Sequence, residues 1–110
     1  MGDCALWVAE QTDDSLKALF IADAHYKNGN TAEAVGMLKA QKIRLPEINK
    51  KAGQACGRKI SLPAGLADDI DAVQGMMERK EDYSRVHAKV YEIDKKQAVR
   101  GYEEYCRWRR

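Results

Sequence analysis

Apolar residues recur at helical spacing along the chain, and this periodicity restricts its fold more than any other feature. One stripe steps by four, three and four residues through Leu66, Ile70, Val73 and Met77. This is the spacing that lines one face of an α-helix. No segment alternates polar and apolar β-branched residues over four or more positions, as a half-buried strand does. The sequence therefore predicts an all-α protein.

The stripe loses its phase across Glu78 to Asp82 and a second stripe then follows. It runs at near-heptad spacing through Tyr83, Val86, Val90 and Ile93. Two helices over roughly 64–79 and 82–108 are predicted. The loss of phase favours a bend between them, although one continuous helix and a hairpin both stay open.

The nine residues YKNGNTAEA, at 26–34, combine a helix stop signal with a helix start signal. Gly29 fits the left-handed position that follows a helix C-terminus, and Asn30 or Thr31 suits the cap of the next helix. The pattern predicts a tight αα-hairpin of two helices, over 12–28 and about 31–42. Its inward-facing residues are predicted to be Leu16, Leu19, Phe20, Ala24, Ala34, Val35 and Leu38, with Met37 as a further candidate.

The remaining boundaries follow from capping and proline positions. Thr12 and the two aspartates after it predict the start of the first helix, because such residues suit a helix N-terminus. Pro46 is predicted at the first turn of a third helix, where a missing N–H costs nothing. The three helices make a helix-turn-helix-like unit over 1–60. A C-terminal helical or oligomerisation region covers 61–110, and the two parts are expected to form one compact domain.

Charge is segregated along the chain, although the formal net charge is only +2. Residues 39–60 carry seven basic side chains against one acidic side chain. In a helix-turn-helix protein the third helix enters the major groove, where Lys and Arg bind phosphates and amides reach base edges. The predicted nucleic-acid-binding residues are Lys39, Lys42, Arg44, Asn49, Lys50, Lys51, Gln54, Arg58 and Lys59. The alternative is a solvated basic surface that balances acidic neighbours within the fold.

The last predicted helix offers a second candidate surface. Tyrosine is enriched at protein interfaces, and a tryptophan between arginines in the terminal CRWRR suits stacking on a base or contact with a partner. The simpler interpretation of this tryptophan is that it closes the core. These features suggest a helical interaction module, an adaptor or inhibitor of a host protein complex. The predicted partner-binding residues are Tyr91, Tyr102, Tyr105, Arg107, Trp108 and Arg109. Homo-oligomerisation through the 83–106 seam is a third hypothesis.

The segment FIADAHYKNGNTAEAVGMLKAQ, at 20–41, resembles the N-terminal helix-turn-helix of phage small terminase subunits. That family commonly shows an aromatic residue, then Gly-Asn, then Glu-Ala. The resemblance implies a phage or mobile-element protein that binds duplex DNA and oligomerises through its C-terminal helices. The AGY that usually ends the second helix is replaced here by AQKIR. The hairpin also resembles a single tetratricopeptide repeat through Ala22, Tyr26, Gly29, Glu33, Ala34, Leu38 and Pro46, without a second copy at the repeat period.

The sequence does not indicate an enzyme. Cys4, Cys56 and Cys106 are widely spaced, which predicts neither a disulfide framework nor a zinc site, and His25 and His87 have no Cys or His at ligand spacing. A phosphate loop is missing, so no cofactor is expected. No apolar run approaches the roughly 20 residues of a membrane span, and a cytoplasmic protein is expected.

Overall fold

The computed structural model describes residues 2–56 and 65–109, and it describes side-chain surroundings for 10–51, 54 and 65–97. In that part of the chain the structure contains helices and no strand, which confirms the all-α prediction. The helices are α1 (Gly2–Lys27), α2 (Thr31–Cys56), α3 (Leu66–Glu78) and α4 (Tyr83–Arg109).

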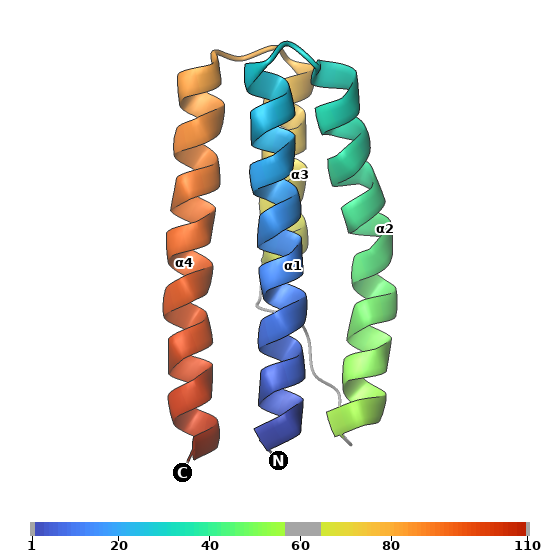
Figure 1. Ribbon diagram of the computed structural model, residues 1–110, viewed down its shortest axis with the longest axis vertical. Helices are drawn as coiled ribbons and strands as arrows, with labels where there is room; N and C mark the ends of the chain where they lie inside the picture. The colour runs from blue at the N-terminus through green and yellow to red at the C-terminus, as the bar shows by residue number, and fades with distance from the viewer. Residues whose placement is uncertain (1, 57–64, 110) are drawn as a thin grey trace.

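The four helices lie side by side and run alternately up and down, as in an antiparallel bundle (Figure 1). α1 packs against α2 and α4, and α3 packs against α2 and α4 as well. The α1–α2 turn and the α3–α4 turn lie at the same end of the bundle, and both chain ends lie at the other. Because α3 is the short helix, it accompanies its neighbours only over the end that carries the turns.

The turn predicted after α1 is present. Gly29 has a φ of +84°, and its N–H donates to the Tyr26 carbonyl at 3.1 Å. The Asn30 N–H donates to the His25 carbonyl at 2.8 Å. Together these two bonds make a Schellman motif. The Asn30 carbonyl then accepts from the Ala34 N–H at 3.0 Å, so the stop and the start are adjacent as predicted.

The α3–α4 turn repeats the same motif without a glycine. Lys80 has a φ of +55°, and its N–H donates to the Met77 carbonyl at 3.0 Å, while the Glu81 N–H donates to the Met76 carbonyl at 3.1 Å. The two C-terminal helices therefore form a hairpin, and the alternative of one continuous helix is wrong. The Tyr26 hydroxyl donates to the backbone carbonyl of Glu81 and joins the two turns.

Two predicted boundaries are wrong. α1 begins at Gly2, and Thr12 is buried within the helix instead of capping it. α2 continues through Pro46, so the expected break before this residue is absent. A proline inside a helix removes a donor and crowds the preceding turn, but Leu45 and Ile48 beside it are buried and hold the segment in place. The predicted third helix is therefore the second half of α2.

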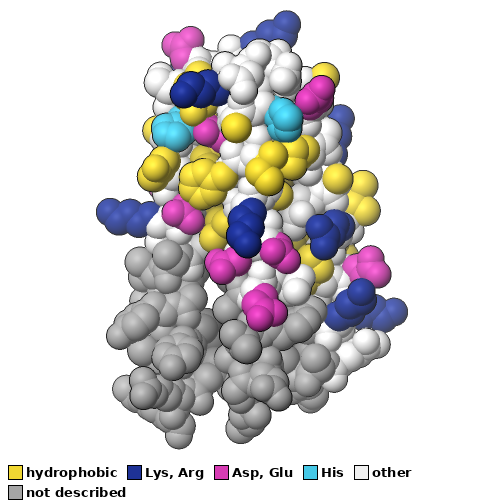
Figure 2. Space-filling view, viewed as in Figure 1, with side chains coloured by type: hydrophobic (Ala, Val, Ile, Leu, Met, Phe, Trp, Pro, Cys, Tyr) yellow, Lys and Arg dark blue, Asp and Glu magenta, His cyan; other side chains and the backbone are white. Residues whose placement is uncertain are grey.

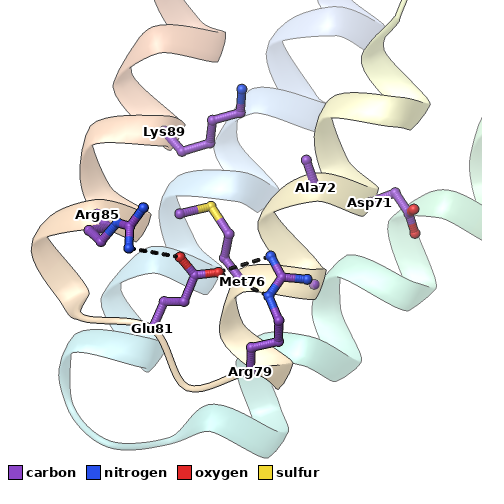
Figure 3. Close-up of a pocket in the computed structure, with 8 residues that line it drawn as sticks. Asp71, Ala72, Met76, Arg79, Glu81, Arg85 and Lys89 are labelled. Carbon is purple, nitrogen blue, oxygen red and sulfur yellow. Dashed lines mark hydrogen bonds and ion pairs between the residues drawn. The ribbon is translucent and has the colours of Figure 1, made fainter.

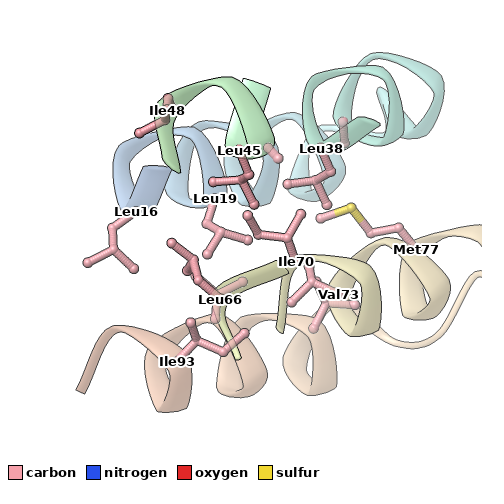
Figure 4. Packing of buried hydrophobic residues seen from close by; sticks show 14 residues of the cluster. Leu16, Leu19, Leu38, Leu45, Ile48, Leu66, Ile70, Val73, Met77 and Ile93 are labelled. Carbon is pink, nitrogen blue, oxygen red and sulfur yellow. The ribbon is translucent and has the colours of Figure 1, made fainter. Parts of the chain in front are cut away.

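The core is aliphatic and follows the predicted stripes (Figure 4). All four stripe residues of α3 are buried, and so are the three aliphatic residues of the α4 stripe. Leu16, Leu19 and Leu38 are buried as expected, but Ala24 is exposed and Phe20 lies half-buried. The reason is that α1 turns its Leu19 and Ala22 side toward the bundle axis, which leaves Ala24 outside.

A polar layer crosses the interior beside this aliphatic core. Gln41 Nε2 donates to the buried Ser15 Oγ at 2.7 Å, which links α2 to α1. Asp69 of α3 lies 2.7 Å from Lys96 Nζ and accepts from Gln97 Nε2 at 3.4 Å, which links α3 to α4. Burying such groups without partners costs about 1 to 3 kcal/mol each, so the pairing across helices is what makes the layer tolerable.

Candidate functional site

Aromatic side chains line the seam where α1 meets α4, and we call Phe20, Tyr83, His87 and Tyr91 the aromatic edge. The Phe20 and Tyr91 rings meet edge to face with centroids 5.9 Å apart. The His87 ring lies 4.9 Å from the Tyr91 ring and 5.3 Å from the Tyr83 ring. Tyr91 is 56% exposed despite these contacts. Figure 2 shows apolar side chains gathered on this face, over α4 and α1.

A buried carboxylate contacts two side chains of the aromatic edge on their buried side. Asp23 of α1 is 5% exposed, and its Oδ2 accepts from the Tyr83 hydroxyl at 2.9 Å. His87 Nδ1 lies 3.1 Å from the same Oδ2 and 3.1 Å from the Tyr83 oxygen. Among the described residues Asp23 Oδ1 has no hydrogen-bond partner. Asp23 therefore fixes the positions of both rings.

The environment of Tyr83 disfavours loss of its phenolic proton. Partial burial raises its pKa, and the Asp23 carboxylate raises the pKa further by accepting the phenolic hydrogen bond and by its negative charge. The Lys27 ammonium lies 5.8 Å from the centre of the Tyr83 ring. The phenol therefore stays a donor to Asp23 at neutral pH, and the aromatic edge keeps its geometry.

The polar pair beneath the aromatic edge and the exposed rings of the edge have different chemical properties. Asp23 and His87 have the pairing that orients a general base. Within the described ranges, however, no group of three or more His, Cys, Asp or Glu residues is placed to hold a metal ion. The three cysteines lie where side chains are not described. The exposed part of the site is ring surface, mainly that of Tyr91, and ring surface recognises a partner by burial.

The cations predicted to bind nucleic acid are divided between paired and unpaired groups. Lys42 Nζ lies 2.7 Å from Asp71 Oδ1 on α3, and Lys51 Nζ lies 3.8 Å from a Glu47 carboxylate oxygen one turn earlier. These two cations are therefore already partly neutralised. Three others are exposed and have no ion-pair partner among the described residues: Lys39, Arg44 and Lys50.

The other residues predicted to bind nucleic acid differ in their exposure. Gln54 is exposed and Asn49 is half-buried. Arg58 and Lys59 lie outside the described residues. The exposed face of α2 also carries Ile43, which is 77% exposed. The structure thus places the basic residues along one wall of a bundle, where the sequence had placed them on a separate third helix.

The predicted partner-binding set is described only in part. Tyr91 is exposed as expected. The other members, Tyr102, Tyr105, Arg107, Trp108 and Arg109, lie in the part of α4 whose side chains are not described. Sequence reasoning missed His87 and Asp23. The available signal was the four-residue step from Tyr83 through His87 to Tyr91, which marks an aromatic stripe beside the aliphatic one.

A groove between α3 and α4 is lined by several cations, but they are already paired (Figure 3). The Glu81 carboxylate lies 2.9 Å from the guanidinium of Arg79 and 3.8 Å from that of Arg85. Lys89 Nζ lies 3.5 Å from Glu92. This groove is therefore a weaker candidate for anion binding than the exposed face of α2.

Comparisons with protein-family models, with curated proteins and with solved structures each returned no match. Among the described helices, none combines the length and the hydropathy that crossing a bilayer requires. The fold and the site together define a small antiparallel four-helix bundle with an exposed aromatic edge.

Proposed function

We propose that this chain is a non-enzymatic helical interaction module, an adaptor or inhibitor that docks on a partner protein through the aromatic edge. The observation that carries the proposal is the position of Tyr91, which stays more than half exposed while Phe20 and His87 hold its ring. Tyrosine is one of the residues that dominate binding energy at protein interfaces.

The supporting contacts explain why such a surface binds well. A ring that is already held in place loses little side-chain entropy on binding, so more of the buried area appears as affinity. His87 is held in turn by the buried Asp23. The aromatic edge is thus preorganised for binding, on two helices of a packed bundle.

Tyr91→Ala is expected to weaken partner binding by at least about tenfold, because truncating an anchor residue at an interface typically costs about 2 kcal/mol or more, and about 1.4 kcal/mol already corresponds to a factor of about ten. The tagged chain is used to recover proteins from a nuclease-treated lysate of the source cells, and recovery is measured by quantitative mass spectrometry. Glu92→Ala is the matched control, since Glu92 is the adjacent exposed residue and lies outside the aromatic edge. Equal recovery of every protein by wild type and Tyr91→Ala contradicts the proposal.

A second candidate is binding of duplex nucleic acid along α2, as the small-terminase resemblance implied. The exposed and unpaired Lys39, Arg44 and Lys50 support it. Since residues 46–56 continue α2 and form no separate helix that could enter a groove, the contacts would be to phosphates, and sequence preference would be low.

For this candidate, three phosphate contacts predict that the logarithm of the duplex affinity falls with the logarithm of salt concentration at a slope of about −2.7. Fluorescence anisotropy with a labelled duplex measures the slope, and Lys39→Glu combined with Lys50→Glu should abolish binding. Lys95→Glu on α4 is the control. Absence of binding at low salt removes this candidate and leaves protein docking.

A further inference from the structure

Two stripes of opposite charge lie side by side on the face formed by α1 and α2, which we call the α1–α2 face. The acidic stripe on α1 is Glu10, Asp13 and Asp14, and all three are exposed. The cationic stripe on α2 is Lys39, Arg44 and Lys50, also exposed. None of these six side chains has an ion-pair partner among the described residues. Figure 2 shows acidic side chains over α1, below the apolar patch, with a basic side chain directly above them, and basic side chains over α2 with an acidic one among them. Exposed Lys17 on α1 and exposed Glu47 on α2 are the side chains of opposite sign on these two helices.

Apolar surface lies exposed on the same face. Ile21 on α1 is 50% exposed, and Ile43 on α2 is 77% exposed. Gly36 and Ala40 lie on the exposed side of α2. Because their side chains are small, the helix surface protrudes less at these two residues than at its neighbours. The Gly36 Cα has nothing within 4 Å of the place where a Cβ would stand. The face therefore combines two exposed isoleucines and two small residues with charged side chains, a mixture of apolar and charged groups that occurs at protein interfaces.

The antiparallel hairpin sets the two stripes at matching heights. α1 ends and α2 begins at the turn at 28–30. Asp14 and Arg44 lie almost equally far from this turn along their helices. Gln11 and Arg44 line one shallow hollow between the helices, which agrees with this placement. A two-fold axis parallel to the bundle would therefore set α1 of one copy against α2 of another, at the same height.

Helical register also matches the charges across such an axis. At about 100° per residue, Asp14 and Arg44 both lean toward the seam between α1 and α2. Asp13 leans toward α4, and Lys50 leans toward α3. In the two-fold arrangement Asp14 of one copy meets Arg44 of the other near the axis, at the same height. Lys50 is closest in height to Glu10, and Asp13 lies further toward the outer side of the contact. Lys17 on α1 and Glu47 on α2 are also exposed and add one charge of the other sign to each side, so the acidic excess of α1 faces the cationic excess of α2.

We propose that this chain forms a homodimer through the α1–α2 face, with the acidic stripe of each copy on the cationic stripe of the other. Ile21 of one copy packs on the low surface at Gly36 and Ala40 of the second copy. The occupant is a second copy because the chain itself supplies both halves of the charge pattern at matching heights. This inference does not depend on the proposed docking function.

The dimer has two consequences for the rest of the surface. It leaves the aromatic edge uncovered, because Phe20 and Tyr91 lie on the α1–α4 side of the bundle. One dimer therefore presents two copies of the docking site and gains avidity for a partner with two binding sites. The dimer also covers Arg44 and Lys50, so nucleic acid and the second copy compete for the same cations.

A charge exchange tests the proposal on the full-length chain. One variant carries Arg44→Glu and Lys50→Glu, and the other carries Asp13→Lys and Asp14→Lys. In each variant alone the exchanged positions carry the same sign as the stripe they face, with only Lys39 or Glu10 of the changed stripe unaltered, so we expect the dimer dissociation constant to rise by at least about tenfold. In an equimolar mixture the exchanged positions of the two variants again face opposite charges, and we expect the dimer to return as a heterodimer. Sedimentation velocity measures all three samples at low salt.

Circular dichroism establishes that both variants keep their helix content, and Lys95→Glu on α4 is the control that leaves the dimer unchanged. A wild-type chain that stays monomeric at every concentration overturns the proposal. A mixture that stays monomeric while wild type dimerises overturns it too, because the copies then meet elsewhere. A wild-type monomer that binds duplex DNA through Arg44 and Lys50 assigns the cations to nucleic acid and equally overturns it.

Discussion

Ile70→Ala is expected to lower the free energy of unfolding by about 2 to 5 kcal/mol, the range for deleting a fully buried aliphatic side chain. Ile70 is 0% exposed and lies in the aliphatic cluster, with Leu38 and Leu45 of α2 beside it (Figure 4). The loss combines the transfer free energy of the deleted carbons with the cavity that the neighbouring helices cannot close. Denaturant titration followed by circular dichroism measures the change.

Ile43→Ala is the matched control for this measurement. Ile43 is 77% exposed on α2, so the same deletion should change the free energy of unfolding by no more than about 0.5 kcal/mol. Both variants are measured at a chain concentration where wild type is monomeric, so that any effect on self-association does not enter. A loss below about 1 kcal/mol for Ile70→Ala would contradict the packing described for α3.

Pro46→Ala is expected to raise the free energy of unfolding by about 1 to 3 kcal/mol. A proline inside a helix costs roughly 3 kcal/mol relative to alanine, because it lacks an N–H donor and crowds the carbonyl four residues before it. Pro46 lies well inside α2 and is exposed, so alanine restores the hydrogen bond and leaves no cavity. Thermal and denaturant unfolding measure the gain.

The same variant separates the observed helix from the one predicted from the sequence. At the first turn of a separate third helix, a proline costs nothing, and replacing it by alanine would bring no gain. Lys50→Ala, at an exposed position on the same helix, is the control and should change stability by no more than about 0.5 kcal/mol. An unchanged or lower stability for Pro46→Ala would show that α2 is interrupted at this residue.

The elements that the sequence predicted correctly depend on local signals. Gly29 and Asn30 act within one turn of chain, and the α3 stripe needs only its own spacing, so both were found. Thr12 and Pro46 also carry local signals, for a start and a break, but Thr12 is itself buried within α1, and the buried Leu45 and Ile48 flank Pro46 within α2. At Pro46, packing therefore outweighed the local preference for a break.

The α3–α4 turn and the aromatic edge were harder for different reasons. The turn has Lys80 in the left-handed conformation where a glycine is usual, so no residue type marked it. In the aromatic edge, Asp23 and Phe20 of α1 meet rings from α4 that lie far away in the sequence. Only the pairing of α1 with α4 brings these residues together, and a single sequence does not specify which helices become neighbours. Tyr91 was found because its exposure followed from its own helix.

The buried polar layer limits how the helices can slide along one another. If α4 slipped by one turn against α3, Asp69 would face the aliphatic Ile93 in place of Gln97, and a carboxylate would lose its amide donor inside the bundle. A slip of α2 against α1 would separate Gln41 from Ser15 in the same way. Aliphatic side chains pack almost equally well in several such offsets, whereas these hydrogen bonds form in only one of them. The layer thus selects one alignment of α1 with α2 and one of α3 with α4, at some expense in stability.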